Sequence, residues 1–143
     1  MSPNASSDLS LAKEVLLKDS LSFVLAKSGK VLFKSKSHGI SDLLAMLDAV
    51  GRRTEGASLA DSIVGRAAAL VCVYAKILAV YGESMSEGAL SILRTHGVFY
   101  EFGTLVPRIL NRAKDDICPF DKAISGVEDP RVALDRLKSL KRG

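Results

Sequence analysis

Cysteine and long apolar segments are scarce in this sequence. Only two cysteines are present, which is too few for a disulfide framework and favours a reducing compartment, with the cytoplasm as the simplest placement. The longest apolar run covers residues 67–75, whereas a membrane-spanning helix needs about 20 apolar residues. Residues 1–8 lack the basic and apolar segments of a secretory signal. The sequence therefore predicts neither a membrane protein nor a secreted one.

Tryptophan is absent, aromatic residues make up 6% of the chain, and neither sign of charge dominates, with a net charge of +4. Domains dedicated to nucleic acids usually concentrate basic charge and offer aromatic platforms for base stacking. The composition therefore argues against nucleic acid as the main partner. Two small basic groups still leave open a non-catalytic module that binds an acidic partner or RNA. Their members are Lys27, Lys30, Lys34 and Lys36, and, in the tail, Arg131, Arg136, Lys138, Lys141 and Arg142.

Motifs for metals and cofactors are also missing. The chain has two histidines and contains no Cys-x-x-Cys, His-x-Glu or His-Glu-x-x-His pattern. It contains no Gly-x-Gly-x-x-Gly or P-loop pattern either. We therefore predict no zinc site and no cofactor.

What is present is enough for one folded domain. The chain has 143 residues, of which 48% are hydrophobic, so it can bury a full core. Residues 1–7 are polar and predict a flexible leader, followed by a single domain over residues 8–143.

The pattern of apolar residues predicts an α/β fold. Alternation on both sides of Gly29 predicts a β-hairpin at residues 21–34, preceded by a helix over residues 8–19. Further strands are expected at 57–60, 77–81 and 98–102. Further helices are expected at 42–50 with Ser41 as N-cap, from Asp61 or Ser62 to 75, at 84–96, at 105–112 and at 130–140. Strands that alternate with helices favour a parallel sheet, and the hairpin makes it mixed. An exposed edge strand of this sheet could pair with a second copy in a homodimer.

The segment from Asp61 to Arg66 is the first candidate site, because a strand is expected to pass into a helix there. Ligands of open α/β sheets bind beyond the carboxyl ends of strands. Free N–H groups at the helix start, together with Arg66, would suit a phosphate or a carboxylate. Asp61 could bind a ribose hydroxyl or act as a base, and Gly65 would allow close approach. Alternatively, Asp61 is an N-cap and Gly65 permits close helix packing.

The other candidates lie at the next helix start, just before the long loop 113–127, and within that loop. Ser84 and Glu87 form a Ser-x-x-Glu capping box, which needs no ligand, or they complete the rim of the site. Asn111 and Arg112 offer an amide and a guanidinium. Cys118 is either a nucleophile or a small apolar plug, and neighbouring acidic residues work against a thiolate.

Several stretches together resemble a known family. They are residues 21–25 with 29–33, residues 60–69, residues 86–90, and the segment from Val106-Pro107 through Asn111-Arg112 to Cys118-Pro119. The chain resembles the family called domain of unknown function 1893, over about residues 9–140. The resemblance implies a cytidine-deaminase-like fold, a three-layer α/β/α sandwich with a mixed sheet.

Deaminases of that fold hold zinc through His or Cys at two helix starts, with a glutamate as proton shuttle. The corresponding positions here, near residues 61–67 and 84–88, contain neither His nor Cys. The resemblance therefore implies a zinc-free domain without zinc-dependent deamination.

We expect this domain to bind a small ligand that carries a nucleotide or a phosphate. Its pocket would contain Asp61, Gly65, Arg66, Ser84, Glu87, Asn111, Arg112 and Cys118. An alternative is a thiol-dependent enzyme with Cys118 as nucleophile and Asp61 or Glu87 as acid and base. The non-catalytic interaction module is the third hypothesis.

Overall fold

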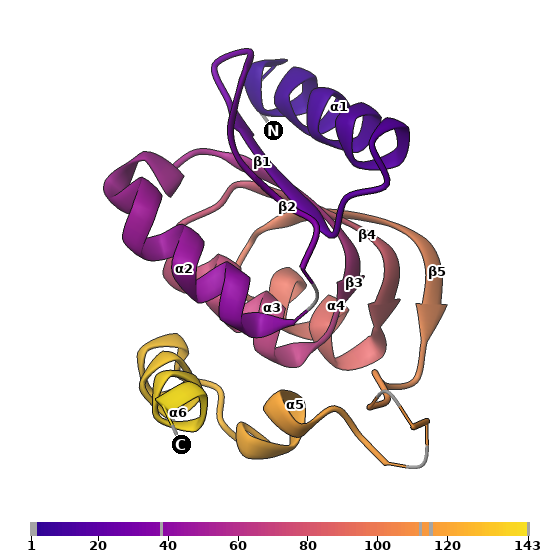
Figure 1. The fold of residues 1–143 in the computed structure, drawn as a ribbon, viewed down its shortest axis with the longest axis vertical. Coiled ribbons are helices and arrows are strands. Elements are labelled where there is room, and N and C mark those ends of the chain that lie inside the picture. Colours follow the sequence, from indigo (N-terminus) through magenta and orange to yellow (C-terminus); the bar gives the residue numbers. More distant parts are fainter. Residues whose placement is uncertain (1–2, 38, 112, 115, 143) are drawn as a thin grey trace.

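A five-stranded mixed sheet forms the centre of the molecule (Figure 1). The computed structural model describes residues 3–37, 39–111, 113–114 and 116–142. The strand order is β2-β1-β3-β4-β5, and β1 runs antiparallel to both β2 and β3 while β3, β4 and β5 are parallel. The strands are β1 (Phe23–Lys27), β2 (Lys30–Ser35), β3 (Ser58–Val64), β4 (Ala79–Ser86) and β5 (Phe99–Val106). The predicted mixed α/β sheet is confirmed.

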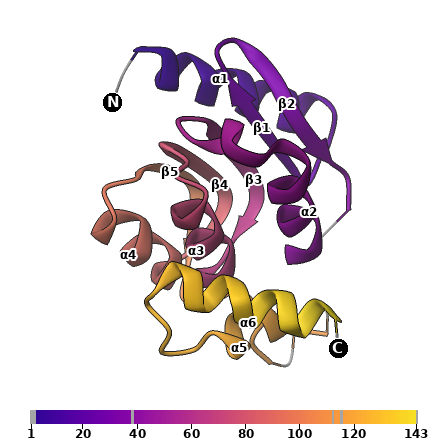
Figure 2. The same cartoon turned by 90° about the vertical axis from the view of Figure 1, so that its left-hand side faces the viewer.

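Helices cover both faces of this sheet. They are α1 (Pro3–Lys18), α2 (Ile40–Val50), α3 (Arg66–Tyr74), α4 (Glu87–Thr95), α5 (Pro119–Ala123) and α6 (Pro130–Arg142), with a short 3-10 helix, η1 (Gly51–Thr54), after α2. One face carries α1, which packs on β1 and β3, and the opposite face carries α2, α3 and α4 (Figure 2). Helix α6 packs against α3 from outside. The three-layer α/β/α architecture is thus the one expected.

The N-terminal hairpin is confirmed, but the helix before it starts earlier than predicted. Ser28 and Gly29 form the turn with positive φ angles, and their backbone N–H groups donate to the Asp8 carboxylate at 3.0 and 2.8 Å. Helix α1 begins at Pro3 rather than at Asp8. The physical reason is burial, because Ala5 lies in the core and its carbonyl accepts a hydrogen bond from Ser58 Oγ at 2.9 Å. Residues 3–7, assigned above to the leader, are therefore helical.

Strands β3 and β4 extend further than the sequence predicts. Three residues that were predicted as helix caps therefore lie in these strands. Asp61 is paired with Phe23 of β1 on one side and with Gly82 of β4 on the other, so it lies within the sheet and caps no helix. Ser62 follows it in the same strand. Ser84 belongs to β4, and the N-cap of α4 is Ser86, whose Oγ accepts from the backbone N–H of Ala89 at 3.1 Å.

Three further boundaries concern α2 and the C-terminal region. Helix α2 begins at Ile40 after Gly39, so Ser41 is not its N-cap. The helix expected at 105–112 is absent from the described residues there, because β5 continues to Val106 along β4. Helix α6 begins at Pro130 as predicted, and the Asp129 carboxylate accepts hydrogen bonds from two backbone N–H groups of its first turn.

Candidate functional site

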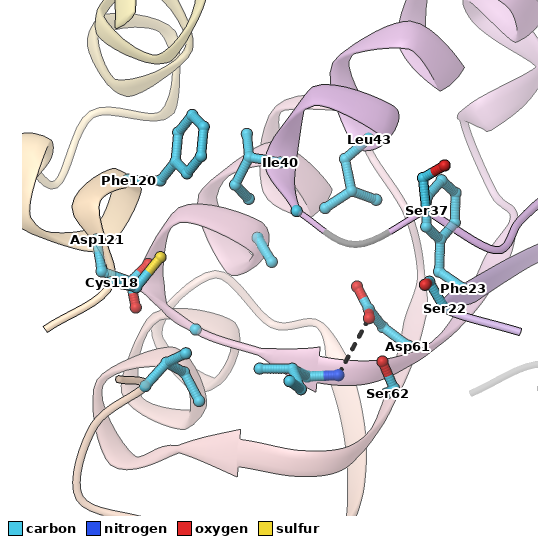
Figure 3. A pocket seen from close by; sticks show the side chains of 15 residues that line it. Ser22, Phe23, Ser37, Ile40, Leu43, Asp61, Ser62, Cys118, Phe120 and Asp121 are labelled. Atoms are coloured by element: carbon cyan, nitrogen blue, oxygen red, sulfur yellow. Dashed lines mark hydrogen bonds between the residues drawn. The ribbon is translucent and has the colours of Figure 1, made fainter. Parts of the chain in front are cut away.

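A small cavity lies at the carboxyl end of β3 (Figure 3). Its volume is about 100 Å³. Its walls come from the starts of β1, α2 and α3, from the end of β3, and from the segment that contains α5. This is the end of the sheet at which open α/β folds bind ligands. We call it the Asp61 cavity.

Asp61 supplies a buried carboxyl to this cavity. The residue is 6% exposed, and its Oδ1 accepts a hydrogen bond from the backbone N–H of Ile63 at 3.1 Å. Burial raises the pKa of Asp61 to about 7, although the backbone hydrogen bonds from Ile63 and Ser62 work in the opposite direction. No described Lys or Arg forms an ion pair with this carboxyl. Asp61 can therefore gain or lose a proton near neutral pH.

Asp121 is a second buried carboxyl in the same cavity, and it is bound to a helix start. The residue is 8% exposed, and its Oδ1 accepts from the backbone N–H of Ala67 at 2.9 Å, in the first turn of α3. A Cβ atom at Gly65 would overlap Asp121 Oδ2, so glycine leaves the room that this carboxylate needs. Burial raises the pKa of Asp121, and the backbone hydrogen bonds of Ala67 and Arg66 and the Arg66 charge oppose that rise.

The anion that the sequence predicted at this helix start is thus supplied by the chain itself. Sequence reasoning missed Asp121 in this role, since 54 positions separate it from Ala67. One signal was available: α3 begins at Gly65-Arg66-Ala67, where the local sequence offers no Ser, Thr, Asp or Asn at the N-cap. The free N–H groups of a helix start without a local cap need hydrogen-bond acceptors from another part of the chain.

Cys118 also lines the Asp61 cavity and is half-buried. It comes from the N-cap position of the short helix α5. Both carboxyls, those of Asp61 and Asp121, line this cavity with it, and none of the described lining residues is a Lys, Arg or His.

A second cavity, which we call the cationic cavity, lies at the start of α4. It has a volume of about 150 Å³, and Arg66, Arg108 and Lys122 line it. Asp121 lines both cavities and so lies between them. Arg66 Nη2 donates to the Val127 carbonyl at 3.0 Å, which directs this guanidinium toward the C-terminal segment.

The two remaining cations of the cationic cavity differ in their partners. Lys122 forms a 2.6 Å ion pair with Asp116, and both side chains are more than half exposed. Arg108 is exposed, and it takes part in no ion pair among the described residues. Arg108 is therefore the cation with the greatest freedom to meet an anionic ligand.

The predicted site residues are thus only partly brought together. Asp61, Gly65 and Cys118 share the Asp61 cavity, and Arg66 lines the cationic cavity next to it. Ser84 is half-buried in β4 and Glu87 is exposed on α4, and neither lines either cavity. Asn111 is half-buried in the loop closed by the bridge from Leu110 to Ile117. Arg112 lies outside the described residues.

The sequence matches one family model, with the description "Domain of unknown function (DUF1893)", over residues 11–140. The chain belongs to the DUF1893 family. No curated protein matches the sequence of this DUF1893 domain.

Solved structures that resemble the DUF1893 domain include a member of the same family and a RibD protein. The crystal structure of a DUF1893 family protein (TM1506) from Thermotoga maritima superposes with a TM-score of 0.86 at 24% identity, over 97% of this chain and 91% of that one. RibD from Acinetobacter baumannii, form 2, has a TM-score of 0.54 at 14% identity. That match covers 69% of this chain and 36% of RibD, so this chain corresponds to about a third of that protein. The fold is cytidine-deaminase-like.

Deaminases of this fold bind zinc at two helix starts, and the residues found there in this DUF1893 domain do not fit a zinc site. The starts of α3 and α4 are Gly65-Arg66-Ala67 and Ser86-Glu87-Gly88, which contain no His or Cys. The Asp121 carboxylate occupies the first turn of α3. In the part of the chain that the structure describes, no three His, Cys, Asp or Glu side chains are grouped as metal ligands. Nor is any described helix long and apolar enough to cross a membrane.

Proposed function

We propose that this domain binds a small molecule carrying a hydrogen-bond donor and an anionic group. The donor would bind Asp61, and the anion, a phosphate as in a nucleotide, would enter the cationic cavity. The observation that carries this proposal is the buried Asp61 carboxyl, which lines a cavity and has no cation beside it among the described residues. Such a group costs stability, so its presence in a cavity is best explained by a ligand.

The volumes limit what the ligand can be. Pockets for whole ligands usually measure about 300–1,000 Å³, whereas the Asp61 cavity holds about 100 Å³. It therefore accommodates one small polar group rather than a complete nucleotide. The rest of the ligand would extend past Asp121 toward Arg66 and Arg108, because Asp121 lines both cavities.

Asp61 is also suited to proton transfer. General acids and bases are most effective when their pKa lies close to the working pH, and the pKa of Asp61 is raised to about 7. A bound group that gains or loses a proton at this position would exchange that proton with the Asp61 carboxyl. This supports a role for Asp61 as acid or base, with Arg108 and Arg66 as anion-binding residues.

The test is ligand binding by the intact chain, measured by thermal shift and calorimetry with nucleoside monophosphates, ribose 5-phosphate, inorganic phosphate and uncharged nucleosides. We expect saturable binding of a phosphate-bearing compound. Asp61→Ala should abolish it, and Arg108→Ala should weaken it about tenfold through loss of one charge-assisted contact. Asp135→Asn and Arg136→Ala, on the exposed side of α6, are matched controls. A folded Asp61→Ala variant that binds as tightly as the unchanged protein would disprove the proposal.

A thiol-dependent enzyme is the second candidate, since Cys118 lines the same cavity as Asp61. In that case Asp61 would take the thiol proton, and the nucleophile would be the Cys118 sulfur. No described Lys, Arg or His lines the cavity to bind that thiolate, so we rank this candidate second. The reactivity of Cys118 separates the two candidates.

A further inference from the structure

Strand β5 (Phe99–Val106) is an open edge of the sheet. It pairs with β4 on one side, and Figure 1 shows it at the margin of the sheet, away from β1 and β2. Three of its large apolar side chains are exposed: Phe99 by 40%, Phe102 by 40% and Leu105 by 39%. A long, apolar edge strand is a ready template for pairing with another chain.

The opposite edge of the sheet is protected, whereas β5 is not. Strand β2 carries two exposed lysines, Lys30 and Lys34, which discourage strand pairing. Strand β5 carries one charged residue, Glu101, and its carboxylate forms a 3.2 Å ion pair with Lys13 of α1. The charge on β5 is therefore already neutralised within the chain.

The backbone fixes which residues of β5 face outward. The N–H of Phe99 donates to the carbonyl of Leu78, just before β4. Because hydrogen-bonding direction alternates along a strand, Phe99, Glu101, Gly103 and Leu105 bond toward β4. The backbone N–H and C=O groups of Tyr100, Phe102 and Thr104 then point away from the sheet. These are the groups that a further strand would bind.

We propose that β5 pairs antiparallel with β5 of a second copy of this chain, about a two-fold axis at Phe102. In this register outward-facing residues meet outward-facing residues: Phe102 is opposite its own copy, and Tyr100 is opposite Thr104. Phe99 then lies opposite Leu105, and Glu101 lies opposite Gly103. Apolar residues thus lie opposite apolar residues, and Glu101 lies directly opposite Gly103 rather than opposite its own copy.

In this register, apolar side chains are buried on both faces of the joined sheet. Glu101 bonds to Lys13 of α1, so Phe99 and Leu105, which alternate in phase with it, lie on the face of α1. Tyr100 accepts from Arg94 of α4, so Phe102 lies on the opposite face. A two-fold axis between two antiparallel neighbours of one sheet is perpendicular to the sheet, so each face continues onto the same face of the second copy. The Phe99–Leu105 pairs would be buried on one face and the Phe102 pair on the other.

The first test is the molar mass of the intact protein in solution, measured by sedimentation equilibrium. We expect a dimer. Phe102→Lys places two like charges opposite each other at the axis and should give a monomer, while Val31→Lys on the β2 edge should leave the dimer intact. Because Phe102 is exposed, this variant should keep the circular dichroism spectrum of the unchanged protein. A monomeric unchanged protein, or a Phe102→Lys variant that stays dimeric, would overturn the proposal.

The second test fixes the register, by disulfide formation in a background with Cys72→Ala and Cys118→Ser. Phe102→Cys should cross-link to its own copy under mild oxidation. Phe99→Cys should not, because its copy lies about 20 Å away at roughly 3.4 Å per residue along the strand. Combining Phe99→Cys with Leu105→Cys should restore cross-linking. Efficient cross-linking of Phe99→Cys alone, or none of Phe102→Cys, would contradict this register.

Discussion

Asp61 and Asp121 are two carboxyls in one cavity with opposite surroundings. Both are almost fully buried, and burial raises the pKa of each. Asp121 accepts a hydrogen bond from the first turn of α3, with the Arg66 charge nearby. Asp61 accepts from the backbone of its own strand, and no described Lys or Arg forms an ion pair with it.

From this difference we infer a structural role for Asp121, whereas the ligand-binding role of Asp61 is our proposal. A carboxylate at a helix N-terminus satisfies free N–H groups and interacts favourably with the helix dipole. Asp121 thereby ties the segment that contains α5 to the start of α3. The side chain of Asp61 accepts hydrogen bonds from the backbone of its own strand, at Ile63 and Ser62. The burial of Asp61 therefore lowers the free energy of unfolding, and these local hydrogen bonds do not compensate for that loss.

The largest effect we predict is a pH-dependent gain in stability for Asp61→Asn. The pKa of Asp61 is raised in the folded state from 3.8 to about 7, so its stabilising protonated form is lost as pH rises through that window. A pKa shift of one unit corresponds to about 1.4 kcal/mol. The titration of Asp61 should therefore lower the free energy of unfolding of the unchanged protein by up to about 4 kcal/mol between pH 4 and pH 8. The amide does not titrate, so Asp61→Asn should be the more stable protein at pH 8.

Urea unfolding at several pH values between 4 and 8 measures this. The exposed carboxyl variant Asp135→Asn serves as control and should follow the pH profile of the unchanged protein. Parallel profiles for Asp61→Asn and the unchanged protein would show that Asp61 does not titrate in this window. Loss of ligand binding together with a gain in stability would mark Asp61 as a functional residue.

The next effect, opposite in sign, is expected for Asp121→Ala. It removes the acceptor for the Ala67 N–H and leaves a buried donor without a partner, which should cost about 2 kcal/mol. Hydrogen exchange should accelerate at Ala67 while the amides of β3 stay protected. Asp129→Ala, which removes the exposed cap of α6, is the matched control and should cost less. Unchanged exchange at Ala67 would rule out Asp121 as its cap.

A smaller effect is predicted for Gly65→Ala, because its Cβ would overlap the Asp121 carboxylate. We expect a loss of about 1–2 kcal/mol, comparable to other cases of overpacking. In the Asp121→Ala background the space is free, so the same substitution should cost almost nothing. The coupling free energy from this double-mutant cycle measures the contact directly. Additive effects would mean that Gly65 is required for another reason.

The sequence was informative where a structure is determined by neighbouring residues. The hairpin around Gly29 was predicted from alternation and turn chemistry, and the ends of α2 and α4 from Gly51 and Gly97, which both have positive φ angles. The helix start at Pro130 followed from Asp129-Pro130. These signals lie within a few residues of the feature that they predict.

The predictions were wrong where contacts between residues far apart in the chain determine the local structure. Asp61-Ser62 has the composition of a helix cap, but pairing of β3 with both β1 and β4 keeps Asp61 in the sheet. Its place in a cavity with Asp121 depends on how residues 118–121 fold back over α3. A cavity nevertheless lies at the carboxyl end of β3, where the sequence predicts a site, because the order of strands and helices fixes that end of the sheet.

The smallest effect is expected at Cys118, the third chemical group of the cavity. Cys118 is half-buried, and no described Lys, Arg or His lines its cavity, so we expect its alkylation to be slow below pH 7. Peptide mass spectrometry after iodoacetamide treatment measures the rate. Cys72 is the internal control, because burial and the Asp61 charge raise the pKa of its thiol and it should not react in the folded protein. Rapid alkylation of Cys118 at pH 6, abolished by Asp61→Ala, would instead place a thiolate in this cavity and favour the thiol-dependent enzyme. Slow alkylation, with ligand binding intact in Cys118→Ser, leaves Asp61 as the reactive group of the pair.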